Sequence, residues 1–213
     1  EHVGIYYARG GMIRIPEALR RVGELHGMQV RTGTRVSKVL MEGRRAIGVQ
    51  LADGSEISAK IVVSDINAKT LYLDMIGAEY LPSAVARGIR SYKLSLSVPM
   101  IYLALDASPE LEAHHSLIAI SPEELNRYYY DNLLTGRLND GPFGLMCWPT
   151  HTDKSLAPLG KHVLNLIPQG FYHLADTDWD SEKPRYIERT IESLSRSAIP
   201  GLKDKVVFAE CAT

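Results

Sequence analysis

The feature that most limits how this chain can fold is an amphipathic helix pattern that runs straight into strand patterns. Apolar residues recur over residues 15–26 at the spacing that lines one face of a helix. Pro16 suits the first turn of this helix, and Gly27 suits its end. Strand-like runs begin at the next residue, so we expect a fold that mixes helices with sheet.

Tight-turn signals separate the strand-like runs that follow the helix. Glu42-Gly43-Arg44 joins two runs and predicts a hairpin, and Asp53-Gly54 predicts a second tight turn. Ile61-Val62-Val63 is a continuous apolar run, which suits a strand covered on both faces. The earlier runs span residues 28–31, 35–41 and 46–51.

The rest of the chain alternates helix and strand signals, which predicts a mixed α/β (α+β) architecture. Asn67 suits the cap of a short helix that Gly77 ends, and residues 121–124 carry a cap, a first-turn proline and a capping-box glutamate. A run over residues 95–105 contains Pro99, which cannot donate to a sheet, so this strand should lie at an edge or carry a bulge. Further helices are expected over residues 82–89 and 187–198, and further strands over residues 116–120, 143–148, 162–167 and 206–208.

Composition and charge narrow the class of protein. The chain has 213 residues, 45% of them hydrophobic and 23% charged, which is typical of globular proteins with a sizeable core. Lys and Arg number 24 against 25 Asp and Glu, so the net charge of -1 gives no overall reason to expect a nucleic-acid partner. Cys147 and Cys211 lie far apart without a C-x-x-C spacing, so we expect neither a disulfide framework nor a thiolate metal site, which fits a reducing cytoplasm. No apolar run approaches the length that spans a bilayer.

Several short motifs stand along the chain in a specific order. Those of the first third are Gly10-Gly11-Met12, Arg31-Thr32-Gly33-Thr34-Arg35-Val36, Gly48-Val49-Gln50-Leu51-Ala52-Asp53-Gly54 and Ile61-Val62-Val63-Ser64-Asp65. Together with runs at residues 95–106, 153–160 and 199–202, they resemble the phytoene desaturase and phytoene dehydrogenase-related branch of the flavin amine oxidase superfamily. The resemblance covers nearly the whole chain.

The resemblance implies a set of contacts with FAD. Val36 would lie against the adenine end of the cofactor, with its backbone N–H and C=O groups as the contacts. Ser64 would end a strand that leads from the flavin domain toward the substrate domain, close to the cofactor. Gly10 and Gly11 precede the helix and could meet a flavin or substrate group at its N-terminus, but two glycines also serve any tight turn.

The resemblance also implies a division into domains. Residues 1–67 would be part of the FAD-binding domain, residues 68–205 the substrate-binding domain, and residues 206–213 the start of a strand that returns to the FAD domain. No G-x-G-x-x-G follows a strand, and those glycines let a helix N-terminus hold a pyrophosphate. We therefore expect an internal fragment that binds little or no FAD by itself.

The activity implied is hydride transfer between FAD and an apolar isoprenoid or carotenoid-like substrate, in a desaturation, a saturation or an isomerisation. Because the cofactor carries the difficult step, the sequence nominates no catalytic side chain. The alternative is a non-catalytic module that binds an apolar ligand or a partner subunit.

Five cations are scattered along the middle of the chain and predict a solvated surface. The other interpretation is peripheral contact with a membrane. These cations are Lys60, Lys69, Arg87, Arg90 and Lys93.

Three other groups of residues could be interpreted as functional sites, but the sequence pattern favours an ordinary structural role for each. His114-His115 would be a metal pair, but adjacent residues in extended chain point to opposite sides and no carboxylate or third His stands at a ligand spacing, so we expect a solvated loop and no metal. Cys147, His151 and Asp153 lie close in sequence and could be interpreted as a catalytic triad. A triad is defined by its geometry, which closeness in sequence does not provide, so we expect Cys147 to be a half-buried strand cysteine. Tyr128-Tyr129-Tyr130 favours helix packing over the wall of a lipid-sized pocket.

Overall fold

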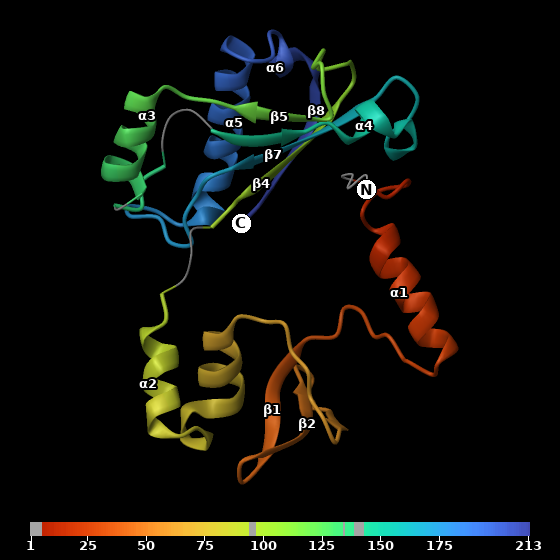
Figure 1. Ribbon diagram of the computed structural model, residues 1–213, viewed down its shortest axis with the longest axis vertical. Helices are drawn as coiled ribbons and strands as arrows, with labels where there is room; N and C mark the ends of the chain where they lie inside the picture. Colours follow the sequence, from red (N-terminus) through yellow and green to blue (C-terminus); the bar gives the residue numbers. More distant parts are fainter. Residues whose placement is uncertain (1–5, 94–96, 134, 139–142) are drawn as a thin grey trace, which may run out of the picture. The chain divides into compact units, whose positions relative to one another are not determined.

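The computed structural model describes residues 6–93, 97–133, 135–138 and 143–213. The chain forms two compact units, Arg20–Leu94 and a second unit that combines Glu1–Leu19 with Ser95–Thr213 (Figure 1). It is 37% helical and 24% strand, which confirms the expected mixed fold class. The domain boundaries expected from the sequence resemblance stay a prediction.

The helix expected at the start of the chain is present as α1 (Arg14–Leu25). It begins in the second unit and ends in the first, and none of its residues is buried. Leu19 is 67% exposed and Leu25 is 84% exposed, so its apolar face has no cover among the described residues. The run 28–31, expected to be a strand, has no regular structure.

The first unit is built on a three-stranded antiparallel sheet in the order β1-β2-β3. The predicted hairpin is confirmed, with Gly43 at its turn in the left-handed region at φ 57°. Gly48 lies opposite β3, where an added Cβ would come 2.3 Å from the Ile57 carbonyl oxygen, so the close approach of the two strands requires glycine. The strands are β1 (Val36–Glu42), β2 (Arg45–Leu51) and β3 (Glu56–Ser58).

The apolar run Ile61-Val62-Val63 does not form the buried strand that its composition predicted. Ile61 is 79% exposed and Val63 is 90% exposed. An extended apolar segment becomes a strand only when a neighbouring strand pairs with its backbone N–H and C=O groups, and no described strand pairs with this one.

The helices expected after this segment are confirmed. At the start of the first of them, Asn67 Oδ1 accepts a hydrogen bond from the Lys69 N–H at 2.9 Å. They are η1 (Thr70–Gly77, a π-helix), η2 (Ala78–Tyr80) and α2 (Ser83–Ser91).

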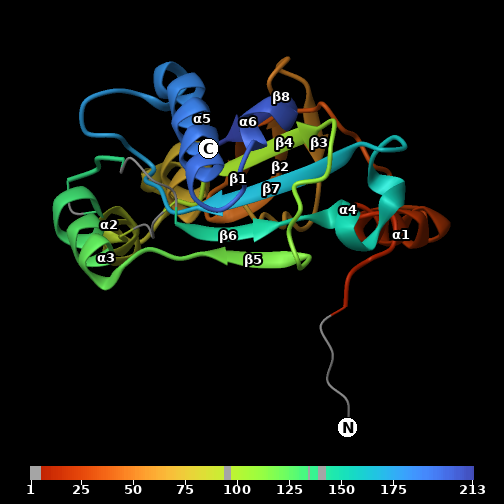
Figure 2. The same ribbon diagram turned by 90° about the horizontal axis from the view of Figure 1, so that it is seen from above.

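The second unit is built on a five-stranded antiparallel sheet in the order β5-β6-β7-β4-β8 (Figures 1 and 2). Of the two alternatives expected for the strand with Pro99, the edge position is wrong, because Pro99 precedes β4 and β4 pairs with both β7 and β8. The other alternative agrees with the structure, because the pairing of β4 with β8 shifts register between Ala104 and Leu105. The first residues of that expected strand, 95 and 96, lie outside the described part. The strands are β4 (Met100–Leu105), β5 (His115–Ile118), β6 (Gly144–Cys147), β7 (His162–Pro168) and β8 (Val206–Ala212).

One face of this sheet packs against the longest helix and forms the main core. Alternate residues of β4 and β7, among them Ile101, Leu103 and Leu166, are at most 1% exposed and belong to one hydrophobic core with Leu194 of that helix. The capping box at Ser121 is confirmed, since its side chain and that of Glu124 each accept the other's backbone N–H. The helices are α3 (Pro122–Arg127), η3 (Tyr128–Leu133), α4 (Pro149–Thr152), η4 (Lys154–Leu156), α5 (Trp179–Arg196) and α6 (Leu202–Lys205).

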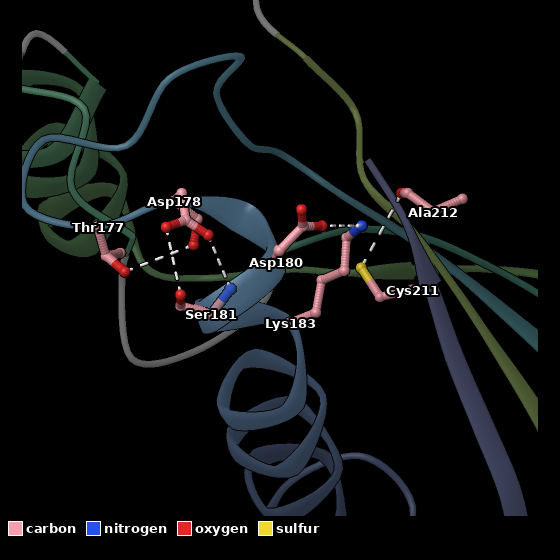
Figure 3. A network of polar contacts seen from close by, with 7 residues as sticks. All are labelled: Thr177, Asp178, Asp180, Ser181, Lys183, Cys211 and Ala212. Carbon is pink, nitrogen blue, oxygen red and sulfur yellow. Dashed lines mark hydrogen bonds and ion pairs between the residues drawn. The ribbon is translucent and has the colours of Figure 1, made fainter.

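The start of α5 is held by a capping network (Figure 3). The Asp178 carboxylate accepts hydrogen bonds from the Ser181 N–H at 2.8 Å and from the Ser181 hydroxyl at 3.2 Å. Lys183 forms an ion pair with Asp180 one turn along, at 3.3 Å. The Asp178 carboxylate thereby satisfies the Ser181 backbone N–H, which the helix itself leaves unpaired, and so caps the start of α5.

A second carboxylate ties the residues before α1 to the loop after β6. Asp153 accepts hydrogen bonds from the Gly10 N–H at 2.6 Å, the Ser155 N–H at 3.0 Å and the Ser155 hydroxyl at 2.6 Å. The Ser155 hydroxyl, followed by the backbone N–H groups of Gly10 and Ser155, lowers the pKa of this carboxyl. Its ionised form is therefore the one that the fold stabilises.

Replacing a central core side chain should destabilise the protein strongly. We expect Leu166→Ala to lower the free energy of unfolding by about 2–5 kcal/mol, because it opens a cavity at a side chain that is 0% exposed. Leu159→Ala, at a fully exposed side chain, should change it by less than about 0.5 kcal/mol. Urea unfolding followed by circular dichroism measures both, and equal losses would contradict this account of the core.

The contribution of Asp153 to stability should depend on pH. Its folded pKa lies below the unfolded value, so the stabilisation is complete above an unfolded pKa of about 3.9 and is lost as the pH falls through the folded pKa. We expect Asp153→Asn to lower the urea midpoint at about pH 7 and to match the unmodified protein in strong acid. Asp180→Asn, at an exposed carboxylate, is the control. A deficit that is the same at every pH would contradict the prediction.

Candidate functional site

The first unit contains a cleft of about 860 Å³, which we call the Val36 cleft. It is lined by the start of β1, the segment 62–67 and η1. Val39, Val49 and Leu71 supply apolar surface, while Arg35 and Asp65 supply polar groups. A volume of this size is within the usual range for small-molecule and cofactor pockets, roughly 300–1,000 Å³.

The Val36 backbone N–H is directed to an open edge of the sheet. The Ala52 N–H donates to the Arg35 carbonyl at 2.9 Å, so that carbonyl faces β2. In a trans peptide the C=O of one residue and the N–H of the next point in opposite directions, and the chain has no cis peptide among its described residues. The Val36 N–H therefore faces away from β2, on the side where no described strand pairs with β1.

Two of the four cofactor residues expected from the sequence meet in this cleft, because Val36 and Ser64 both line it. Gly10 and Gly11 belong to the other unit. They make a tight turn with φ values of 84° and 90°, in which the Gly11 N–H donates to the Ala8 carbonyl and the Gly10 N–H donates to Asp153. Their backbone donors are thus engaged within the protein, and their assignment to the flavin stays a prediction.

The second unit contains a further cleft of about 890 Å³, which we call the histidine cleft. It is lined by Tyr7, Arg9, His114, His115 and the segment 152–155. The Tyr7 ring packs edge-on against the His114 ring, with centroids 5.1 Å apart. Its walls therefore carry aromatic rings, two cations and one carboxylate.

Cys147 finds a different partner from the one that its sequence neighbours suggested. Its Sγ lies 3.2 Å from His114 Nε2, while His151 packs its ring against Trp148 and Asp153 holds Gly10 and Ser155. Burial raises the pKa of the Cys147 thiol, and burial, with His115 and His151, lowers the pKa of His114. The pair is therefore a neutral thiol beside a neutral imidazole near pH 7, and not the ion pair of a cysteine nucleophile. No local sequence signal would have found this pair, because it depends on the pairing of the strands that carry His115 and Cys147.

The tyrosine run behaves mainly as helix packing. Tyr128 is 3% exposed and packs against Phe143 and Phe171, and burial raises its pKa to about 12. Tyr129 and Tyr130 are 50% and 70% exposed. Within the described part of the chain, every helix is too short or too polar to cross a membrane.

Known proteins resemble this chain in sequence and in structure. No protein-family model matches the chain. A lycopene-forming phytoene desaturase from Paracoccus sp. is 30% identical over 211 residues, covering 94% of this chain and 40% of that protein. A zeta-carotene-forming phytoene desaturase from Myxococcus xanthus is 28% identical and covers 96% and 38%, and a chloroplastic prolycopene isomerase from Arabidopsis thaliana is 25% identical and covers 99% and 34%.

Solved structures agree on the fold. An oxidoreductase from Methanosarcina mazei matches with a TM-score of 0.61 at 23% identity, over 95% of this chain and 42% of that one. Reduced UDP-galactopyranose mutase matches with a TM-score of 0.59 at 15% identity, over 96% and 38%. The chain spans about two-fifths of the length of the relatives that it matches. Over nearly its whole length, it is homologous to one part of the phytoene desaturases and related carotenoid oxidoreductases, as its motifs indicated.

Proposed function

We propose that this chain is part of an FAD-dependent oxidoreductase that acts on an apolar isoprenoid substrate, and that the Val36 cleft receives the adenine end of FAD. The Val36 N–H, aimed at an open sheet edge beside a cleft that Ser64 also lines, is the observation that carries the proposal. Relatives over nearly the whole chain are named phytoene desaturases and prolycopene isomerases, which supports the substrate class.

The residues of the cleft fit one end of the cofactor and not the whole of it. Apolar side chains such as Val39 and Leu71 suit the face of an adenine ring, and a backbone N–H at the rim suits a ring nitrogen. The pyrophosphate needs a glycine-rich turn at a helix N-terminus, and the 213 residues contain no G-x-G-x-x-G after a strand. The holder of the pyrophosphate therefore lies in another part of the proposed oxidoreductase.

The second unit offers an apolar surface that suits a hydrocarbon substrate. Leu117, Leu145 and Ile167 lie side by side on adjacent strands, on the sheet face opposite the core. Leu117 is 69% exposed and Leu145 is 47% exposed, and Tyr102 adds a ring on the same face. Burial of such a surface favours an apolar ligand. FAD would supply hydride transfer to or from a substrate carbon, and the protein would supply alignment and exclusion of water.

The decisive measurement for the enzyme is the visible spectrum of the whole oxidoreductase that contains this chain. We expect flavin absorption bands at close to one FAD per polypeptide. If the reaction is a desaturation, those bands should bleach when an isoprenoid substrate is added without an electron acceptor, because the flavin then keeps the hydride taken from the substrate. A folded protein that stays colourless with added FAD would favour the alternative of a non-catalytic module that binds an apolar ligand or a partner subunit.

The role of Val36 can be tested with a matched pair of variants in the same flavoprotein. Val36→Pro removes the backbone N–H and should weaken FAD binding roughly tenfold, which corresponds to one lost hydrogen bond. Val36→Ala keeps the N–H and should bind FAD about as well as the unmodified protein. Ser64→Trp, which narrows the cleft without changing β1, should also weaken binding. Equal affinities for all three variants, measured by flavin fluorescence, would place the adenine elsewhere.

A further inference from the structure

Two imidazoles and one thiol come together beside the histidine cleft. His114, His115 and Cys147 each offer one ligand atom, and these atoms all lie within 4.8 Å of one another. The Cys147 Sγ and His114 Nε2 are already 3.2 Å apart. Imidazole and thiolate are the ligand types that zinc prefers in proteins.

The fold holds these three side chains in place through strand pairing. His115 and Cys147 stand directly opposite each other in the antiparallel pair of β5 and β6, so their side chains lie on the same face of the sheet. His114 precedes β5, and its carbonyl accepts the Trp148 N–H at 2.7 Å, which ties it to the end of β6. The adjacent histidines can therefore face one point, since only His115 lies within the strand.

We propose that His114, His115 and Cys147 bind one Zn²⁺ ion at the mouth of the histidine cleft. Tetrahedral zinc with bonds of about 2.0–2.3 Å places neighbouring ligand atoms roughly 3.5 Å apart. The His114–Cys147 pair is near this spacing, and His115 is exposed, so its ring is free to turn toward the other two.

The groups around the three ligands match what a zinc site needs. Thr152 Oγ1 lies 2.6 Å from His114 Nδ1, so an Nδ1–H donated to this hydroxyl leaves the lone pair of Nε2 for the ion. Three protein ligands leave the fourth position to a water from the cleft. Asn165 stands opposite Cys147 on the next strand, and its Oδ1 is buried without a hydrogen-bond partner among the described residues. A metal-bound water is the kind of donor that this oxygen lacks.

The same surroundings select against hard cations. None of the three ligand atoms is an oxygen, the ligand type that Mg²⁺ and Ca²⁺ prefer. Arg9 and Lys154 also line the cleft and repel a cation that has no thiolate to neutralise it. The oxygens of Asp153 are engaged by Gly10 and Ser155, so this carboxylate is not a ready ligand for such ions.

The test is a titration of the metal-free, reduced protein with Zn²⁺ and with Co²⁺, which reports its ligands through absorption. We expect one ion per chain, a tetrahedral cobalt spectrum with a thiolate-to-cobalt band, and displacement of cobalt by Zn²⁺ but not by Mg²⁺. Cys147→Ser should abolish the thiolate band, and His115→Ala should weaken Zn²⁺ binding at least roughly tenfold. Because His115 is exposed, its variant should keep the fold, which circular dichroism checks.

Matched controls use residues of the same types outside the cluster. Cys211→Ser and His26→Ala should leave metal binding unchanged, because Cys211 lies on β8 and His26 follows α1 in the other unit. Zn²⁺ affinity unaltered in His115→Ala, a cobalt spectrum without the thiolate band, or a thiolate band lost in Cys211→Ser and kept in Cys147→Ser would each overturn the proposal. None of these measurements needs bound FAD, so the zinc site and the flavin proposal can fail independently.

Discussion

The antiparallel pairing of β5, β6, β7, β4 and β8 is the constraint on which the second unit depends. Side chains alternate across a strand, so each register divides the sheet into two faces. Leu166 and Ile101 face α5 and are fully buried, whereas their neighbours Asn165 and Tyr102 face the other way. The register of these strands therefore places the core residues on one face of the sheet. The same register places the apolar surface, His115 and Cys147 on the other face.

The two units differ in how well their apolar side chains are buried and their sheet edges are paired. The second unit closes a core around its sheet and α5, and polar caps fix the ends of its helices. The first unit leaves an open edge on β1, and apolar side chains such as Val63 are largely exposed. In folded proteins, another strand or a covering element usually protects an open sheet edge, and other residues usually cover a large exposed apolar face. The exposed surfaces therefore agree with a chain that spans about two-fifths of its relatives.

Expectations from the sequence held where the physical cause is local. Spacing and end signals placed α1, Gly43 placed the hairpin turn, and Ser121 with Glu124 placed the start of α3. The strands expected at residues 28–31 and 61–63 are absent, and the strand after Pro99 is central with a register shift instead of lying at an edge. All three outcomes depend on pairing with distant segments. Composition indicates that a run can be a strand, but it does not say which strand will lie beside it.

The sequence by itself determined the helices α1, α2, α3 and α5, the hairpin turn, the mixed fold class and the family resemblance. Helix propensity, capping and turn chemistry act over a few residues, and the order of the motifs is read directly from the sequence. Only the tertiary structure decided that Val36 and Ser64 line one cleft, and that Cys147 meets His114 and His115 instead of His151. Val36 and Ser64 are 28 residues apart in the sequence, and Cys147 is 32 residues from His115 and 33 from His114. Their meeting follows from sheet register and loop packing, which no local pattern encodes.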